Sequence, residues 1–369
     1  MQRTNPYLLC FKNGVLDIKE KKFRPIREDD YFEKCTNIDY IPIDHQKHKK
    51  TIDEINDFMT ILFPSPQKRE YMWEHLASIL IGGDKGVWNQ DIHFYNGSGP
   101  NGKSLRNATS KSIIIYLLSQ CLGDYYTEVP YSLLQPPEPL IYSSKKNSLN
   151  NIMLKLKESR LAVIYGPPIS VTLNSGWLKS ITSGCDVVNV IGLNGQPITF
   201  IPHFKIVVCS NNLNLMNVND TTDGIWRRIA VVDFNAKIDY PLMSLVDYDM
   251  NEKILIWREV FMSMLVDIVL KTQGDVKRCE IIIDETSAYR NKQDLVSEFI
   301  NSRIQFKEGG KIQKTPLSQE YKLHLHRKVR KSELAELEEA MNKKFGEYDS
   351  KKKCWKNVKL IYDGDEDDE

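Results

Sequence analysis

The sequence predicts an α/β protein with a parallel sheet at its core, and three observations support this fold class. Four nearly continuous apolar runs have the composition of strands buried on both faces of a sheet: 92–95, 161–165, 205–210 and 229–234. Helical and loop segments separate these runs, as the crossovers between parallel strands require. The first run leads into the segment GSGPNGKS, and a helical segment at 103–118 follows. A phosphate-binding loop is therefore expected between a strand and a helix.

A small α+β module is predicted before the core, at residues 1–85. It begins with short apolar runs broken by Asn13-Gly14, which is a pattern of strands and turns. Helical spacing then takes over within 51–82, where Pro64 and Pro66 are expected to stop a first helix and a second helix spans 71–81. The first helix carries its apolar side chains on one face: Ile52, Ile55, Phe58, Met59 and Leu62.

The core itself is expected at 86–274, closed by a long apolar helix at 253–270, and residues 275–369 are expected to form a separate unit. That last unit is predicted to contain three helices followed by a β-hairpin, an arrangement typical of a winged helix. The helices are expected at 294–304, 316–325 and 333–345, and a hairpin strand at 354–362.

Basic clusters in the C-terminal unit offer contacts for DNA phosphates. One cluster includes Arg327, Lys328, Arg330 and Lys331, and the other is Lys351-Lys352-Lys353. An equally weighted alternative is a solvated basic face, offset by the acidic tail at 363–369.

Composition narrows the class of protein. The 369 residues carry 50 Lys and Arg against 49 Asp and Glu, and a net charge of +1 argues against a uniformly basic nucleic-acid coat. Seven cysteines are scattered singly without a CxxC pair, which favours reduced thiols in an intracellular, cytoplasmic protein. No apolar run approaches the roughly 20 residues needed to cross a bilayer, so no membrane partner is expected.

The strongest chemical signal is the segment Gly97-Ser98-Gly99-Pro100-Asn101-Gly102-Lys103-Ser104. Its spacing is that of a phosphate-binding loop, whose backbone amides and following helix end converge on phosphate oxygens. Lys103 is expected to contact the β and γ phosphates of ATP, and Ser104 to be a ligand of Mg²⁺. The glycines allow the backbone to approach the phosphates closely.

Several motifs together resemble one family, the superfamily 3 helicases of the poxvirus, large DNA virus and phage primase-helicase type. The motifs occur in this order: FKNGVLDI, IDYIP, GSGPNGKS, ITSGCDVVNV, FIPHFKIVVCSNN, DGIWRRIAVVDF and, more weakly, AYRNKQDLVSEFI. The resemblance covers nearly the whole chain. It implies an AAA+ ATPase core and a homo-hexameric ring that hydrolyses ATP between subunits and moves along a DNA strand.

The resemblance also implies roles for residues beyond the loop. Asn211 stands at the place of the polar sensor that orients the attacking water beside the γ-phosphate. Arg227 and Arg228 stand at the place of the arginine finger, which offsets transition-state charge on the nucleotide of a neighbouring subunit. Arg228 is favoured as the finger, and a structural salt bridge is the alternative for one of the two.

The chain departs from the family pattern in two places. An acidic pair that holds Mg²⁺ is expected after the strand at 161–165, but the sequence there reads Ile164-Tyr165-Gly166-Pro167-Pro168. Loss of this carboxylate would spare nucleotide binding and reduce hydrolysis severely. In the second place, 189–196, the family has a hairpin with a basic tip that grips single-stranded DNA.

This second segment keeps the hairpin turn Asn194-Gly195 but has no basic residue of its own. Three flanking basic residues, Lys179, His203 and Lys205, are expected to contact the DNA strand instead. Ordinary solvated side chains are the alternative, which is weighted more strongly for Lys179 than for Lys205.

Two functional hypotheses follow from the resemblance. The first is an ATP-dependent DNA helicase or translocase in viral or phage replication. The second is a ring-forming scaffold that binds nucleotide and DNA, hydrolyses ATP poorly, and tethers or loads a primase. A phosphate-loop kinase is a distant third, because no lid or acceptor-site residues are visible. The expected partners are single-stranded or forked DNA and a primase, since the chain is either a fragment of a longer primase-helicase or acts with a separate primase.

Overall fold

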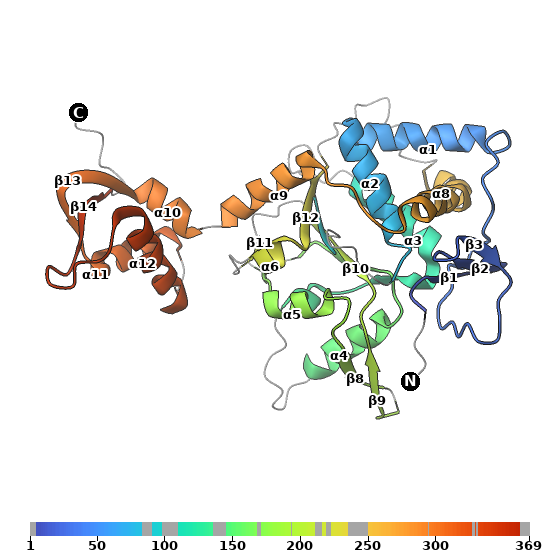
Figure 1. The fold of residues 1–369 in the computed structure, drawn as a ribbon, viewed down its shortest axis with the longest axis horizontal. Helices are drawn as coiled ribbons and strands as arrows, with labels where there is room; N and C mark the ends of the chain where they lie inside the picture. The colour runs from blue at the N-terminus through green and yellow to red at the C-terminus, as the bar shows by residue number, and fades with distance from the viewer. Residues whose placement is uncertain are drawn as a thin grey trace. The chain divides into compact units, whose positions relative to one another are not determined.

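The computed structural model describes residues 5–82, 91–97, 110–135, 145–167, 171–192, 194–210, 216–218, 223–234, 250–293, 295–326, 329 and 331–361. Contacts divide the chain into two compact units, Met1–Tyr289 and Arg290–Glu369 (Figure 1). The division therefore falls after most of helix α9 (Glu280–Gln293), rather than near residue 275. The reason is that Cys279, Ile282 and Tyr289 are buried in the core of the first unit.

The centre of the first unit is a five-stranded sheet in the order β12-β4-β10-β6-β5, in which every neighbouring pair is parallel. The strands are β4 (Ile92–Asn96), β5 (Tyr126–Glu128), β6 (Leu161–Tyr165), β10 (Lys205–Ser210) and β12 (Ile229–Asp233). The four apolar runs are all strands of this sheet, so the predicted α/β class is confirmed. All six residues of β10 are buried, as expected for a strand covered on both faces.

Helices cover both faces of this sheet. Side chains alternate along each strand, so that successive residues belong to two apolar clusters, one on each face. Leu161, Val163 and Val207 face a layer that includes α1 (Lys49–Leu62), α2 (Pro66–Ser78), α3 (Ser110–Leu122) and α8 (Met250–Thr272). Ala162 and Ile206 face the other layer, which includes 3-10 turn η3 (Tyr131–Leu134), α4 (Lys145–Leu156), α5 (Ser175–Ile181) and α6 (Asp223–Trp226). Figure 1 shows these two layers around the strands.

The N-terminal module begins with a three-stranded antiparallel sheet, β1 (Leu8–Phe11), β2 (Gly14–Asp17) and β3 (Lys22–Arg24). The two predicted helices follow, but Pro66 begins the second helix instead of only stopping the first. Ser65 is its N-cap, and the Ser65 side chain accepts a hydrogen bond from the backbone amide of Lys68. A proline in the first turn costs no helix hydrogen bond, since that amide has no partner inside the helix.

Short elements lie at the margins of the core. A 3-10 turn, η2 (Gly123–Tyr125), joins α3 to β5. Strands β7 (Val171–Thr172) and β11 (Met216–Asn217) pair in parallel, and β8 (Val188–Ile191) pairs antiparallel with β9 (Pro197–Phe200). All seven cysteines are free thiols. Within the described ranges, no helix has the length and apolar character to span a bilayer.

The second unit contains α10 (Leu295–Arg303), β13 (Ile304–Ile312), α11 (Lys314–His324), α12 (Lys331–Phe345) and β14 (Trp355–Leu360). The three predicted helices are present, but the expected order of three helices followed by a hairpin is wrong. Strand β13 lies between α10 and α11, and β14 pairs antiparallel with β13. Apolar side chains at both ends of β13, Ile304 and Ile312, are buried in the small core of this unit.

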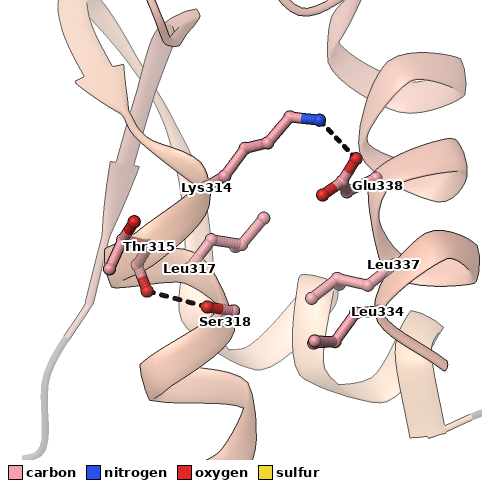
Figure 2. A pocket seen from close by; sticks show the side chains of 7 residues that line it. All are labelled: Lys314, Thr315, Leu317, Ser318, Leu334, Leu337 and Glu338. Carbon is pink, nitrogen blue, oxygen red and sulfur yellow. Dashed lines mark hydrogen bonds and ion pairs between the residues drawn. The ribbon is translucent and has the colours of Figure 1, made fainter. Parts of the chain in front are cut away.

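A small cavity of about 150 Å³ lies between α11 and α12. Its lining includes Leu317, Leu334 and Leu337, which also contribute to the core of the unit. Figure 2 shows the Lys314 ammonium donating a hydrogen bond to the Glu338 carboxylate above these leucines. The cavity is thus a gap in the packing of two helices, closed on one side by an ion pair.

Candidate nucleotide-binding site

The phosphate-binding loop begins where β4 ends. Gly97 directly follows β4, and its surroundings are crowded: a Cβ atom there would lie 3.2 Å from the Phe234 carbonyl oxygen and 3.3 Å from the Phe234 Cβ. The other predicted loop residues lie outside the described residues: Ser98, Gly99, Pro100, Asn101, Gly102, Lys103 and Ser104. The described part of the following helix, α3, begins at Ser110. A strand before the loop and a helix after it are therefore present, and the predicted start of the helix at 103 lies outside the described residues.

The carboxyl ends of three adjacent strands meet beside Gly97. Asn96 on β4 is in register with Ser210 on β10 and with Asp233 on β12. The Asn96 side-chain amide donates to the Asp233 carboxylate at 2.7 Å, and the Phe234 amide donates to the Asn96 carbonyl. Asn211, the predicted sensor, follows Ser210 in the sequence and lies outside the described residues.

Two lysines that the motifs did not indicate stabilise this edge of the sheet. Lys68 of α2 donates to the Asp233 carbonyl at 2.7 Å and forms an ion pair with Glu285 of α9 at 2.6 Å. Glu285 in turn accepts the Asp233 amide. Burial raises the pKa of Glu285, although the Lys68 ammonium opposes this shift.

The second lysine, Lys111 of α3, lies under the start of the loop. Its ammonium donates to the Gly97 carbonyl at 3.1 Å and to the Ser210 carbonyl at 2.6 Å. The only sequence signal for Lys111 was a charged residue beside the apolar run Ile113-Ile114-Ile115, whose side chains are buried. No sequence pattern indicated Lys68, because its partner Glu285 is more than two hundred residues away.

The end of β6 lacks the acidic residues that the family pattern places there. Tyr165 is 44% exposed, and Gly166 continues with a positive φ of 47° and donates its amide to the Cys209 carbonyl. The Tyr165 hydroxyl lies 3.3 Å from the Tyr126 hydroxyl, which also contacts the carboxylate of Glu128 at 2.9 Å. Glu128 is on the outermost strand β5, three strands away from β4. With strands about 4.8 Å apart, its carboxylate is roughly 14 Å to the side of the loop and does not replace the missing acid.

The two predicted finger arginines lie at the opposite edge of the sheet. Arg227 and Arg228 immediately precede β12, which runs parallel to β4. The Arg228 carbonyl accepts the amides of Asp91 and Ile92 at the start of β4. Five strand residues at about 3.3 Å each separate this position from the phosphate loop, a distance of roughly 16 Å.

Their side chains differ in environment. Arg228 is half-buried, and its guanidinium donates to the Gly224 carbonyl at 2.5 Å. Burial, and then the charge of Arg227, lower the pKa of Arg228. Arg227 is exposed. The geometry therefore gives Arg228 a structural contact within the chain and leaves Arg227 as the more accessible of the two.

The predicted hairpin is confirmed, but the DNA contact predicted for one of its three flanking basic residues, Lys205, is not. Strands β8 and β9 are joined through Gly195, whose φ of 77° suits the turn, and Ile191 beside the turn is 51% exposed. Lys179 and His203 are half-buried. Lys205 is wrong as a DNA contact, because its side chain is only 4% exposed and its ammonium lies 3.9 Å from the Asp91 carboxylate.

The C-terminal basic cluster is described only in part. Arg327, Lys328 and Arg330 lie outside the described residues, and Lys331 is the first residue of α12. Lys351, Lys352 and Lys353 are exposed in the turn before β14. Among the described residues, no group of three His, Cys, Asp or Glu side chains is placed to hold a metal ion. Ser104, the expected Mg²⁺ ligand, is outside them.

Comparison with known proteins finds similarity to viral helicases and primases. The family described as "D5 N terminal like" matches residues 1–59. A protein of Acanthamoeba polyphaga mimivirus, provisionally named a helicase, is 30% identical over 317 residues, 81% of this chain and 31% of the relative. A protein of African swine fever virus, provisionally named a primase, is 26% identical over 322 residues, 82% of this chain and 31% of the relative. The chain is therefore similar to the D5-like viral helicases and primases.

The chain spans less than a third of the length of these curated relatives, at 31% in both cases. A solved apo structure of the NrS-1 C-terminal region is 12% identical, with a TM-score of 0.45 over 78% of this chain and 62% of that chain. The fold assignment accordingly rests on the parallel sheet and on the helices that flank the loop in this chain.

Proposed function

We propose that the chain is the helicase part of a viral primase-helicase, and that it binds ATP with Mg²⁺ at the Gly97–Ser104 loop. The observation that carries this proposal is the position of the loop sequence between β4 and α3, at the carboxyl end of a parallel sheet. Phosphate sites of α/β proteins lie at this edge, where loop amides and a helix N-terminus converge. The relatives named as helicases and primases support a role in viral DNA replication.

We further propose that the chain acts as a homo-hexameric ring on single-stranded or forked DNA. The support is the distance between the two sheet edges, because arginines roughly 16 Å from the loop of their own chain cannot reach its nucleotide. They can reach the nucleotide of a neighbour in a head-to-tail assembly, and such a heterologous interface forms a ring when the rotation between neighbours closes. On this proposal, Arg227 is the arginine finger and Arg228 fixes the start of β12.

A second candidate function is a ring that binds nucleotide and DNA, hydrolyses ATP weakly, and loads or tethers a primase. The observation that favours it is the sequence Tyr165-Gly166-Pro167 at the end of β6, where a carboxylate would hold Mg²⁺ and polarise water. The partner in this case is a primase domain or a separate primase.

Steady-state ATP hydrolysis with Mg²⁺, measured with and without single-stranded DNA, separates the two functions. Turnover that DNA stimulates and that Lys103→Ala abolishes supports a helicase. Tight ATP binding that Lys103→Ala abolishes, without turnover, supports the scaffold. If wild-type protein binds no labelled ATP in a fluorescence titration, or Lys103→Ala leaves the affinity unchanged, both functions are excluded.

A further inference from the structure

A buried lysine joins the first residue of the phosphate loop to the strand that precedes the predicted sensor. Lys111 is 4% exposed, and its two backbone acceptors belong to different strands, Gly97 after β4 and Ser210 at the end of β10. These strands are neighbours in the sheet. A single ammonium therefore links the two chain segments from which the loop and Asn211 continue.

The cost of burying this ammonium indicates a specific role. Desolvation lowers the pKa of Lys111, because burial disfavours the charged form. The next residues of the same helix bury apolar side chains, Ile113 and Ile114, so an apolar side chain at 111 would suit the interior equally well. The charge brings two charge-assisted hydrogen bonds to carbonyls, which are stronger and more directional than apolar contacts.

Lys68 provides the contrast on the other side of the same loop. Within the described part of the chain, its ammonium has a carboxylate partner, Glu285, and contacts one strand end, the Asp233 carbonyl of β12. Lys68 thus connects α2 and α9 to the sheet. Lys111 instead connects β4, which leads into the phosphate loop, to β10, which leads into Asn211. The relative position of these two strands decides whether the loop and Asn211 can contact the same triphosphate.

We infer that Lys111 is a positioning residue that holds Gly97, where the phosphate loop begins, and Ser210, which precedes Asn211, at a fixed separation, and so sets the preference of the site for ATP over ADP. This inference rests on the proposed function. The loop would contact phosphates that both nucleotides have, whereas Asn211 would contact only the γ-phosphate, which ADP lacks. A shift of β10 relative to β4 therefore weakens ATP binding and leaves most ADP binding intact.

The test measures the dissociation constants of fluorescent ATP and ADP analogues for the full chain, without requiring turnover. Lys111→Met keeps the length of the side chain and removes both hydrogen bonds. We expect the ratio of ATP to ADP affinity to fall about tenfold, with ADP affinity changed less than about threefold. Lys50→Met, at a lysine whose side chain is 92% exposed, is the matched control and should leave the ratio unchanged.

A double-mutant cycle with Asn211→Ala distinguishes positioning from general structural support. If Lys111 acts through Asn211, the double variant loses no more of the ratio than Asn211→Ala alone. Lys111→Arg, which keeps the charge and the donors, should restore at least part of the ratio. Equal losses for ATP and ADP, additive losses in the cycle, or a wild-type chain that binds both nucleotides equally would overturn the inference.

Two further controls keep the result decisive. Thermal unfolding identifies a variant that fails to fold. If Lys111→Met fails, Lys111→Gln, which retains a neutral donor, takes its place. Its ATP to ADP affinity ratio should then be lower than that of wild type, with a fall smaller than the one expected for Lys111→Met. Failure of the proposed function has a different signature, since wild type would then bind neither nucleotide. An intact Lys103-dependent affinity with an unchanged ATP to ADP ratio in Lys111→Met and Lys111→Gln would refute only the role of Lys111.

Discussion

The two edges of the central sheet are built from the same strands but have different chemistry. At the carboxyl edge, the ammonium groups of Lys68 and Lys111 contact backbone carbonyls at the ends of β4, β10 and β12. At the amino edge, the Lys205 ammonium lies 3.9 Å from the Asp91 carboxylate in the interior, and the Arg227 side chain faces solvent. The carboxyl edge is thus organised around the start of one loop, whereas the amino edge presents a cation outward.

This difference matches the proposed ring, in which nucleotide sites are shared between subunits. A nucleotide on the loop would be bound by one chain, and the cation that completes its site would come from the amino edge of another. Because the strands hold the edges roughly 16 Å apart, no side-chain rearrangement within one chain can merge the two functions. Variants that change one edge at a time therefore test the proposed roles of the two edges separately.

The largest expected effect is on turnover in mixed assemblies. Lys103→Ala and Arg227→Ala should each reduce ATP hydrolysis by about a thousandfold, the first through lost phosphate contacts and the second through lost transition-state charge. Arg227→Ala should leave the affinity for fluorescent ATP nearly unchanged. An equimolar mixture of the two variants should recover up to about a quarter of wild-type turnover, since random assembly pairs an intact loop with an intact arginine at that share of interfaces.

A mixture that remains as inactive as either variant alone contradicts the proposal that one chain supplies the loop and its neighbour supplies the arginine. Arg228→Ala is the informative neighbour, because its guanidinium already contacts Gly224 within the chain. We expect it to lower the thermal unfolding temperature, and its mixture with Lys103→Ala should show up to about half of wild-type turnover, because Arg227 is intact in both variants.

The next largest effect concerns the buried charges at the amino edge. Lys205→Met leaves the Asp91 carboxylate in the interior without this cation, and breaking such a pair costs about 3–5 kcal/mol of the free energy of unfolding. Urea denaturation measures this change, with Lys179→Met as the control on a half-buried lysine of the same unit. The salt dependence of DNA binding should stay as in wild type. A smaller salt slope without loss of stability would restore Lys205 as a DNA contact.

Residue types and their spacing predicted most of the sheet but not the interactions at its edges. Continuous apolar runs require burial on both faces, which is why all four runs became strands of one sheet. The position of Lys205 was not predictable in this way, because its partner Asp91 directly precedes β4, and their contact depends on how β4 and β10 pair. Lys111 is a similar case: whether a lysine beside an apolar run is solvated or buried depends on which carbonyls the fold brings near it. For the loop, only the start at Gly97 can be compared with the prediction.

A smaller effect is expected from two stacked histidines between α2 and β4. His75 and His93 lie with ring centroids 3.4 Å apart, and their Nε2 atoms contact the hydroxyls of Tyr95 and Tyr71 at 3.0 and 2.9 Å. Burial lowers the pKa of both histidines well below the usual value, with further lowering by the positive charge of Lys205. For His93, the charge of His75 is the larger of these two additions.

The direction of the pH effect follows from these lowered pKa values. Below about pH 6.5 the unfolded chain binds protons on these histidines and the folded chain does not, so the free energy of unfolding falls by up to about 1.4 kcal/mol per pH unit for each. Stability at neutral pH is unaffected, because both states are then neutral. Urea unfolding between pH 5 and 7 should show a shallower acid limb in His93→Phe than in wild type, whereas equal slopes would mean that the pair does not limit acid stability.

The smallest expected effect separates the two units of the chain. Lys351, Lys352 and Lys353 are exposed in the C-terminal unit, in contrast to the buried lysines of the sheet edges. If they contact a DNA backbone, changing all three to Gln should reduce the slope of log affinity against log salt for single-stranded DNA by about 2, at about 0.7 per phosphate contact. ATP affinity should remain unchanged, because no lysine of the carboxyl edge is altered. An unchanged salt slope would identify these lysines as a solvated face and would leave the hairpin side of the first unit as the place to look for the DNA contact.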